Sequence, residues 1–172
     1  MVFQHLLLTG RPGTGKTSLI REAVAGASVK AGGFYTEEIR RGGIRQGFRL
    51  VTLDGREAVL AHVGFSSLYR VSKYGVDVDS LNRVGLAAIK QALGECDLIV
   101  IDEIGKMELL SPEFREAVRR AIDGDKRVLG TIMLHPNSFC DAVKAHPRVR
   151  VLTVTRDNRD EILGEISEWL AR

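Results

Sequence analysis

A glycine-rich segment near the amino terminus constrains this chain of 172 residues more than any other feature. The segment, residues 10–17, reads GRPGTGKT and fits the pattern G-x-x-x-x-G-K-[ST]. An apolar run at 2–9 predicts a buried strand before it, and helix-forming residues at 17–27 predict a helix after it. Because the pattern binds phosphate in that strand–loop–helix context, a nucleotide site is expected here.

Each part of this phosphate loop has a chemical task. The glycines permit backbone angles that turn several N–H groups toward one anion, and the helix adds the positive end of its dipole. Lys16 supplies a point charge that can reach the β- and γ-phosphates, and the Thr17 hydroxyl is a hard oxygen ligand for Mg²⁺. The expected nucleotide contacts are Gly10, Arg11, Pro12, Gly13, Thr14, Gly15, Lys16, Thr17 and Ser18.

A second motif, IVIDEIGK, delivers two carboxylates at the end of an apolar strand. Ligands of parallel α/β sheets bind at the carboxyl ends of the strands, so Asp102 is expected to face the phosphate loop and to hold Mg²⁺ with Thr17. Glu103 is expected to bind nucleotide and to take a proton from the attacking water; alternatively it is a solvated loop acid or a helix-cap partner. Gly105 adjoins the same site. Lys106 either neutralises the γ-phosphate in the transition state or is a solvated side chain paired with Glu108.

Other polar residues are weaker candidates. The Thr131 hydroxyl, in the next strand, either contacts the γ-phosphate or the water, or belongs to an ordinary strand threonine. His135 is more typical of a loop than of a catalyst. Arg156 or Arg159 could reach the base or a phosphate, but solvated charges at a helix start are favoured. Glu37 either lies on a solvated sheet face or points toward the water.

The pattern of apolar segments predicts an α/β fold, with a mainly parallel sheet covered by helices on both faces. An antiparallel insertion is expected at one edge, because Arg41-Gly42-Gly43 and Asp54-Gly55 are turn signals between three strand-like runs. Residues 65–78 have weak periodicity and are expected to be irregular. Helix caps are predicted at Asp79, Ser111 and Asp157. Strands are expected at 2–9, 33–39, 48–53, 57–62, 97–101, 127–133 and 149–155, and helices at 17–27, 80–93, 111–122 and 157–170.

Composition and charge argue against several classes of protein. The net charge is only +3, from 25 basic and 22 acidic residues, and the basic residues form no evident stripe, so nucleic-acid binding is not indicated. Cys96 and Cys140 are far apart and are expected to be buried free thiols, and the four histidines show no metal-ligand spacing. We expect neither a signal peptide nor a membrane-spanning segment. We expect a single domain over 1–172 that is cytoplasmic and monomeric.

Four longer segments identify a family resemblance. GFYTEEIRRGGIRQGFRLVTLDG, YGVD, IVIDEIGKMELLSPEF and GTIMLHP resemble the small thermophilic nucleoside-triphosphatases, which are related to the cancer-related nucleoside-triphosphatase of animals. The resemblance extends from about residue 6 to 153. It implies a three-layer P-loop fold that slowly hydrolyses ATP, GTP and other nucleoside triphosphates to diphosphates with Mg²⁺. It also places the nucleotide site at 10–17 and 102–106.

Two other functions remain open from the sequence. A kinase acting on small molecules, nucleotides or nucleic-acid ends would use the same phosphate loop, but it needs an acceptor pocket, and no compact arginine-rich lid sequence is present. A nucleic-acid-binding regulator that uses nucleotide as a signal would need a basic stripe. The absence of an Asn-Lys-x-Asp guanine motif argues against a switch GTPase, and without a base-reading motif we expect broad base specificity.

Overall fold

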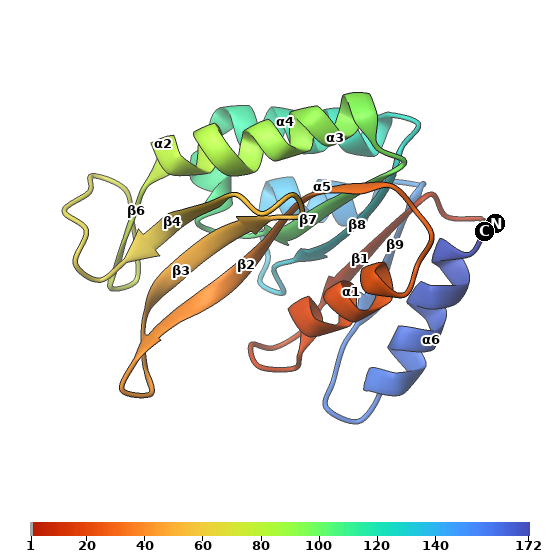
Figure 1. Ribbon diagram of the computed structural model, residues 1–172, viewed down its shortest axis with the longest axis horizontal. Helices are drawn as coiled ribbons and strands as arrows, with labels where there is room; N and C mark the ends of the chain where they lie inside the picture. The colour runs from red at the N-terminus through yellow and green to blue at the C-terminus, as the bar shows by residue number, and fades with distance from the viewer. Residues whose placement is uncertain (1) are drawn as a thin grey trace.

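The strand that leads into the phosphate loop lies inside a parallel group of strands. β1 (His5–Thr9) pairs in parallel with β8 (Arg127–Ile132) on one side and with β9 (Val149–Thr153) on the other. β7 (Leu98–Ile104) follows β8, and β2 (Ala31–Arg41) follows β7, again in parallel. The computed structural model, which describes residues 2–172, thus brings the carboxyl ends of β1 and β7 to one edge of the sheet (Figure 1).

Antiparallel strands extend the sheet beyond β2, as the turn signals predicted. β3 (Ile44–Thr52), β4 (Glu57–His62), β6 (Tyr74–Val76) and β5 (Arg70–Val71) complete the nine-stranded order β5-β6-β4-β3-β2-β7-β8-β1-β9. The prediction that 65–78 is irregular was wrong for the β5–β6 hairpin. Tyr74 and Val76 are buried, but strands of two and three residues are too short to show alternation.

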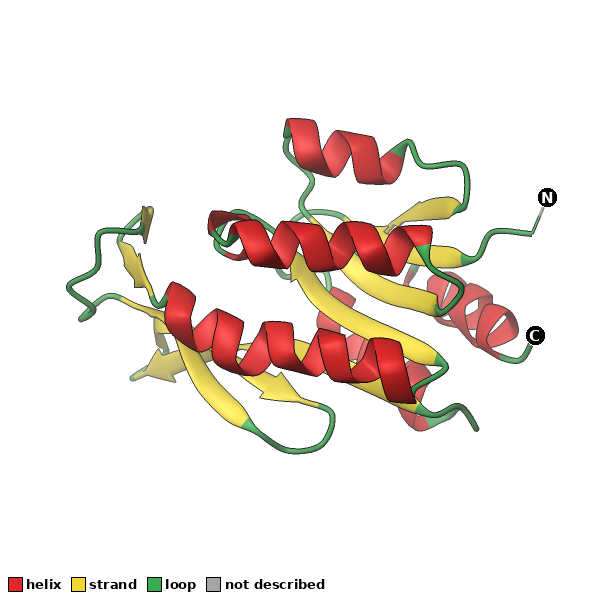
Figure 2. Cartoon of the chain, turned by 90° about the horizontal axis from the view of Figure 1, so that it is seen from above, coloured by secondary structure: helices red, strands yellow, loops and turns green. Residues whose placement is uncertain are grey.

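Helices cover both faces of the sheet. α1 (Lys16–Ala25) and α6 (Arg159–Leu170) pack on one face. The other face carries α3 (Ala87–Glu95), α4 (Pro112–Asp123) and α5 (Ser138–Lys144), which lie side by side in Figure 2. Two further segments, α2 (Val78–Ser80) and the π-helical turn η1 (Leu81–Leu86), lead directly into α3, and a 3₁₀ turn, η2 (Glu108–Leu110), precedes α4. Within residues 2–172, none of these helices has the length and apolar character needed to span a bilayer.

Alternating side chains of β1 join the two layers of the core. Leu6 and Leu8 face α1 and α6, whereas Leu7 faces the layer of α3, α4 and α5, as the two-residue period of a strand requires. All three leucines are buried. Cys96 and Cys140 are buried and free, as predicted. The strand that ends in the phosphate loop is therefore fixed on both faces by apolar packing.

Helix starts agree with the sequence in part. Ser111 Oγ accepts a hydrogen bond from the Phe114 N–H (3.1 Å), as predicted. The cap of the helix at 78–95 is Asp77, which accepts from the Ser80 N–H (2.9 Å), so the assignment to Asp79 was wrong. Asn158, not Asp157, occupies the cap position of α6. Helix α5 was not predicted, because seven residues are too few to establish a helical period.

Candidate nucleotide-binding site

The backbone of the phosphate loop requires glycine at specific positions. Gly13 and Gly15 have φ angles of 80° and 85°, and Gly15 is the cap residue of α1. A Cβ on Gly10 would lie 2.5 Å from the carbonyl oxygen of Val154, which precedes α6. The loop is thus held close to the segment after β9, and larger residues would move it.

Lys16, the first residue of α1, folds back over this loop. Its Nζ donates hydrogen bonds of 3.0 Å to the carbonyl oxygens of Gly10 and Arg11. Burial lowers the pKa of Lys16, whereas the charges of Glu103 and Asp102 raise it. The ammonium group therefore bonds to the loop and is attracted by the acidic residues of β7.

Asp102 is buried at the centre of the site. Its Oδ2 accepts a hydrogen bond from Thr17 Oγ1 (2.7 Å), and its Oδ1 accepts one from Thr131 Oγ1 (2.6 Å). Thr36 on β2 donates its hydroxyl to the Asp102 carbonyl oxygen (2.5 Å), and its N–H lies 3.4 Å from Oδ2. Burial raises the pKa of Asp102, and the hydrogen bonds from Thr131, Thr17 and Thr36 lower it. Threonines from three elements hold this carboxylate.

Glu103 lies beside Asp102 and is partly buried. β7 continues through both acids to Ile104, beyond the predicted end at 101, and the Asp102–Glu103 peptide bond is cis. A Cβ on Gly105 would lie 2.5 Å from Glu103 Oε1, so the carboxylate rests against that glycine. Burial and the charge of Asp102 raise the pKa of Glu103, and Lys16 lowers it. These surroundings are not those of a solvated loop acid.

The residues after Gly105 divide between solvent and core. Lys106 is exposed, whereas Glu108 is only 4% exposed, and no ion pair joins them within residues 2–172. The predicted alternative, a solvated Lys106–Glu108 pair, is therefore wrong. Burial, followed by the charge of Glu103, raises the pKa of Glu108 well above its usual range.

The weaker candidates take different positions. Glu37 contacts Arg21 (2.6 Å) and Arg49 (3.7 Å), and these two positive charges compensate its carboxylate. His135 is exposed in the loop after β8. Arg156 is also exposed, whereas Arg159 forms an ion pair with Glu22 beside the phosphate loop (2.8 Å).

Sequence reasoning missed Thr36. It lies 66 residues before Asp102, and only the pairing of β2 with β7 brings the two together. The signal available in the sequence was a polar residue within the strand-like run GFYTEEI, but an isolated strand threonine does not indicate a site.

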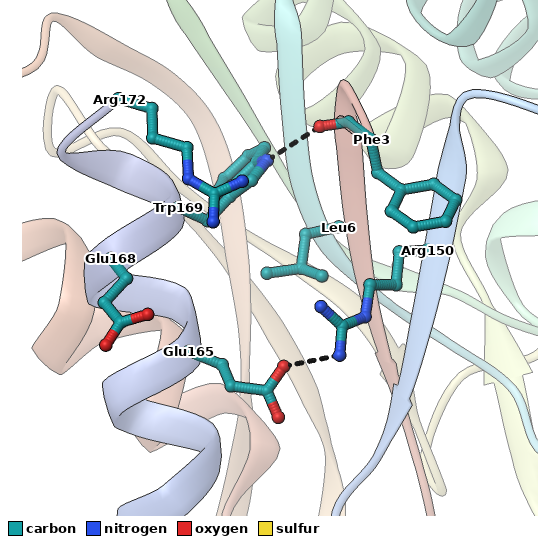
Figure 3. Close-up of a pocket in the computed structure, with 7 residues that line it drawn as sticks. All are labelled: Phe3, Leu6, Arg150, Glu165, Glu168, Trp169 and Arg172. Atoms are coloured by element: carbon teal, nitrogen blue, oxygen red, sulfur yellow. Dashed lines mark hydrogen bonds and ion pairs between the residues drawn. The ribbon is translucent and has the colours of Figure 1, made fainter. Parts of the chain in front are cut away.

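A cavity of about 170 Å³ lies at the opposite edge of the sheet. Figure 3 shows it between the start of β1, β9 and the end of α6, where Arg150 contacts Glu165 (2.7 Å) and the Trp169 indole donates to the Phe3 carbonyl oxygen (3.2 Å). The phosphate loop follows the other end of β1, so this cavity is not part of the candidate nucleotide site.

The oxygen atoms at the centre of the site fit Mg²⁺. Thr17 Oγ1 and Asp102 Oδ2 are neutral and anionic hard ligands, and they lie 2.7 Å apart. No group of three or more His, Cys, Asp or Glu side chains in the described part of the chain could hold a metal alone. Mg²⁺ commonly keeps one or two protein ligands and completes its shell with water and substrate phosphates, so a metal here would be shared with nucleotide.

Known proteins share this sequence and fold along almost the whole chain. The model of a family described as NTPase matches residues 5–167. The nucleoside-triphosphatase THEP1 of Thermotoga petrophila is 47% identical over 94% of this chain and 89% of its own length. The cancer-related nucleoside-triphosphatase homolog of Mus musculus is 38% identical over 95% of this chain and 94% of its own.

A solved structure agrees with these relatives. The crystal structure of THEP1 from the hyperthermophile Aquifex aeolicus superposes with a TM-score of 0.90 at 34% identity, covering 98% of this chain and 99% of that one. The predicted α/β fold, with helices on both faces of one sheet and antiparallel strands at one edge, is therefore confirmed; the parallel part comprises five of the nine strands, β2, β7, β8, β1 and β9. The chain belongs to the nucleoside-triphosphatase family, as the resemblance in its motifs predicted, and is an enzyme of that class.

Proposed function

We propose that this protein hydrolyses nucleoside triphosphates to diphosphate and phosphate with Mg²⁺ held between Thr17 and Asp102. The observation that carries the proposal is the 2.7 Å contact between Thr17 Oγ1 and Asp102 Oδ2, which joins the phosphate loop to the acidic strand. When bound, Mg²⁺ would be held by Thr17 and Asp102 and would offset the negative charge of the triphosphate. The N–H groups of residues 10–18 and the Lys16 ammonium would hold the same phosphates.

Glu103 is the proposed general base. Its carboxylate accepts a proton from water while the water oxygen bonds to the γ-phosphorus and the bond to the β–γ bridging oxygen breaks. Burial and the neighbouring Asp102 raise the pKa of Glu103, and a carboxylate with a raised pKa is a stronger base. Lys16 and the exposed Lys106 would offset charge that develops on the γ-phosphate.

Thr131 and Thr36 are proposed to act through Asp102. Their hydroxyls bond to its carboxylate and carbonyl oxygens, respectively, and so fix the direction in which Asp102 faces Thr17. In this arrangement Thr131 orients Asp102, the proposed metal ligand, and influences the γ-phosphate only indirectly, through Asp102.

Broad base specificity is part of the proposal. The groups of the phosphate loop recognise phosphate and metal, and a strong preference for one base would need several directed hydrogen bonds. The sequence contains no recognisable guanine-reading or adenine-reading motif that would supply such bonds.

Phosphate release tests this function. The protein is supplied with ATP, GTP, CTP or UTP, with and without Mg²⁺, and with no acceptor other than water. Release of phosphate from all four within about a hundredfold range, and only with Mg²⁺, supports the proposal. Phosphate that appears only on an added acceptor would instead indicate the kinase alternative.

A further inference from the structure

The order of the strands fixes which way a bound nucleotide must point. In the order β7-β8-β1-β9, the acidic strand and β9 lie on opposite sides of β1. If the γ-phosphate faces Asp102 and Glu103 on β7, as the proposed function requires, the nucleoside end leaves the loop toward β9 and the start of α6. Figure 1 shows the loop before α1 and the loop before α6 at the same edge of the molecule.

The segment that joins β9 to α6 is packed against the phosphate loop. The Val154 N–H donates to the Thr9 carbonyl oxygen (2.8 Å), and the Val154 carbonyl oxygen leaves no room for a Cβ on Gly10. Asn158 closes the segment on itself, because its Oδ1 accepts from the Thr155 N–H (2.8 Å) and its Nδ2 donates to the Thr153 carbonyl oxygen (2.9 Å). The residue that follows Asn158 is therefore held in place.

That residue, Arg159, lies beside the end of the phosphate loop. Its Nε is 4.0 Å from the position that a Cβ on Gly15 would take. Its Nη2 donates a charge-assisted hydrogen bond of 2.8 Å to Glu22 Oε2 on α1. The contact with Glu22 engages one edge of the guanidinium group and offsets its charge. The side chain remains 38% exposed, so it is open to a ligand.

We propose that the guanidinium of Arg159 stacks on the nucleobase of the bound nucleotide, and that Glu22 is the positioning residue that orients it. Arginine stacks on aromatic rings through its flat, delocalised face, and such stacking tolerates every base because each has a π-face. One side chain would then serve purine and pyrimidine nucleotides alike. This subsite gives the proposed broad base specificity a physical basis and rests on that function.

Binding measurements with and without a base test this proposal. Dissociation constants for ATP, CTP and inorganic tripolyphosphate are measured with Mg²⁺ for the wild-type protein, Arg159→Ala and Arg159→Lys. Both variants should bind ATP and CTP roughly five- to tenfold more weakly, because neither retains a planar cation. Tripolyphosphate has no base, so its affinity should be unchanged.

A matched control separates stacking from general effects on α6. Arg150 on β9 forms an ion pair with Glu165 on α6 (2.7 Å) at the far end of the sheet, so Arg150→Ala removes a comparable contact without altering the nucleoside subsite. Its affinities for all three ligands should match those of the wild-type protein.

Several results would overturn the proposal. Equal weakening of tripolyphosphate by Arg159→Ala would indicate a phosphate contact, and full rescue by lysine would indicate charge alone. An unchanged affinity for ATP and CTP would show that no contact exists, and a wild-type protein that binds no nucleotide would exclude the subsite together with the proposed function. Failure of hydrolysis with the expected binding pattern intact would contradict the proposed function and leave the stacking site standing.

Discussion

Thr131 Oγ1 and Asp102 Oδ1 form a hydrogen bond of 2.6 Å between adjacent strands, and both side chains are buried. Thr131→Val keeps the shape of the threonine but leaves a buried carboxylate oxygen without this donor. We expect a loss of about 1–3 kcal/mol in the free energy of unfolding, measured by urea denaturation. Thr131→Ser retains the hydroxyl and should recover most of the loss. A valine variant as stable as the wild-type protein would show that the contact contributes little.

Gly105→Ala should displace the Glu103 carboxylate, because the added Cβ would lie 2.5 Å from Oε1. Misplacement of a reacting group by about 1 Å can lower turnover by about a hundredfold, so we expect a loss of about ten- to a hundredfold in kcat with nucleotide affinity retained. Gly164→Ala on α6 is the control, since nothing lies within 4 Å of its Cβ position. Normal turnover in Gly105→Ala would show that the reaction does not depend on the position that the Glu103 carboxylate has in this structure.

Lys16→Ala should abolish turnover without unfolding the protein. The side chain is half-buried, its ammonium group bonds to the loop carbonyl oxygens of Gly10 and Arg11, and it is not part of the apolar core, so its removal leaves the core intact. We expect a loss of at least a hundredfold in phosphate release and an unchanged circular dichroism spectrum. Wild-type turnover, or a variant that does not fold, would contradict this assignment.

His5 should make stability fall in acid. Burial lowers the pKa of His5 to about 4 from its usual 6.5, and the nearby charge of Arg148 lowers it further. Two groups oppose this shift: the Ile122 carbonyl oxygen, which bonds to His5 Nε2 (2.9 Å), and the negative charge of Asp123. As pH falls below 6.5, the unfolded chain binds a proton at His5 before the folded chain does. The free energy of unfolding therefore decreases, by about 3 kcal/mol in total when pH reaches about 4.

The non-titrating variant His5→Gln isolates this effect. Its amide can still donate to the Ile122 carbonyl oxygen, but it has no charge to gain. The free energy of unfolding of the wild-type protein, measured by urea denaturation between pH 4 and 7, should therefore fall more steeply in acid than that of the variant. Parallel pH curves for the two proteins would show that His5 titrates normally in the folded state.

Much of the fold follows from local patterns in the sequence. The run HLLLT, the glycines of the loop and the turn Asp54-Gly55 each specify their own structure, because a continuous apolar run and a tight turn are both defined by neighbouring residues. The short helix α5 and the β5–β6 hairpin gave no such signal. Tyr74 reveals the reason for the hairpin, since its ring packs against Phe48 with centroids 5.3 Å apart, a contact between distant segments.

The candidate site was predictable only where its residues belong to motifs. Lys16, Thr17, Asp102 and Glu103 stand in two recognisable segments, and parallel pairing brings the segments to one edge of the sheet. The arrangement around them depends on packing. No local pattern indicates that Asp102 is held by threonines from three elements, or that Arg159 lies beside Gly15.

The general base is the central claim, and Glu103→Gln tests it most directly. Glutamine keeps the size of the side chain but cannot accept the proton, so kcat at saturating ATP and Mg²⁺ should fall by about 10²–10⁴-fold. Nucleotide should still bind, because Lys16, Thr17 and Asp102 remain, and extra Mg²⁺ should not restore turnover. In contrast, extra Mg²⁺ should partly rescue Asp102→Asn, which weakens the proposed metal ligand. If Glu103→Gln keeps most of its wild-type kcat under these conditions, the base lies elsewhere and the proposed hydrolytic mechanism is wrong.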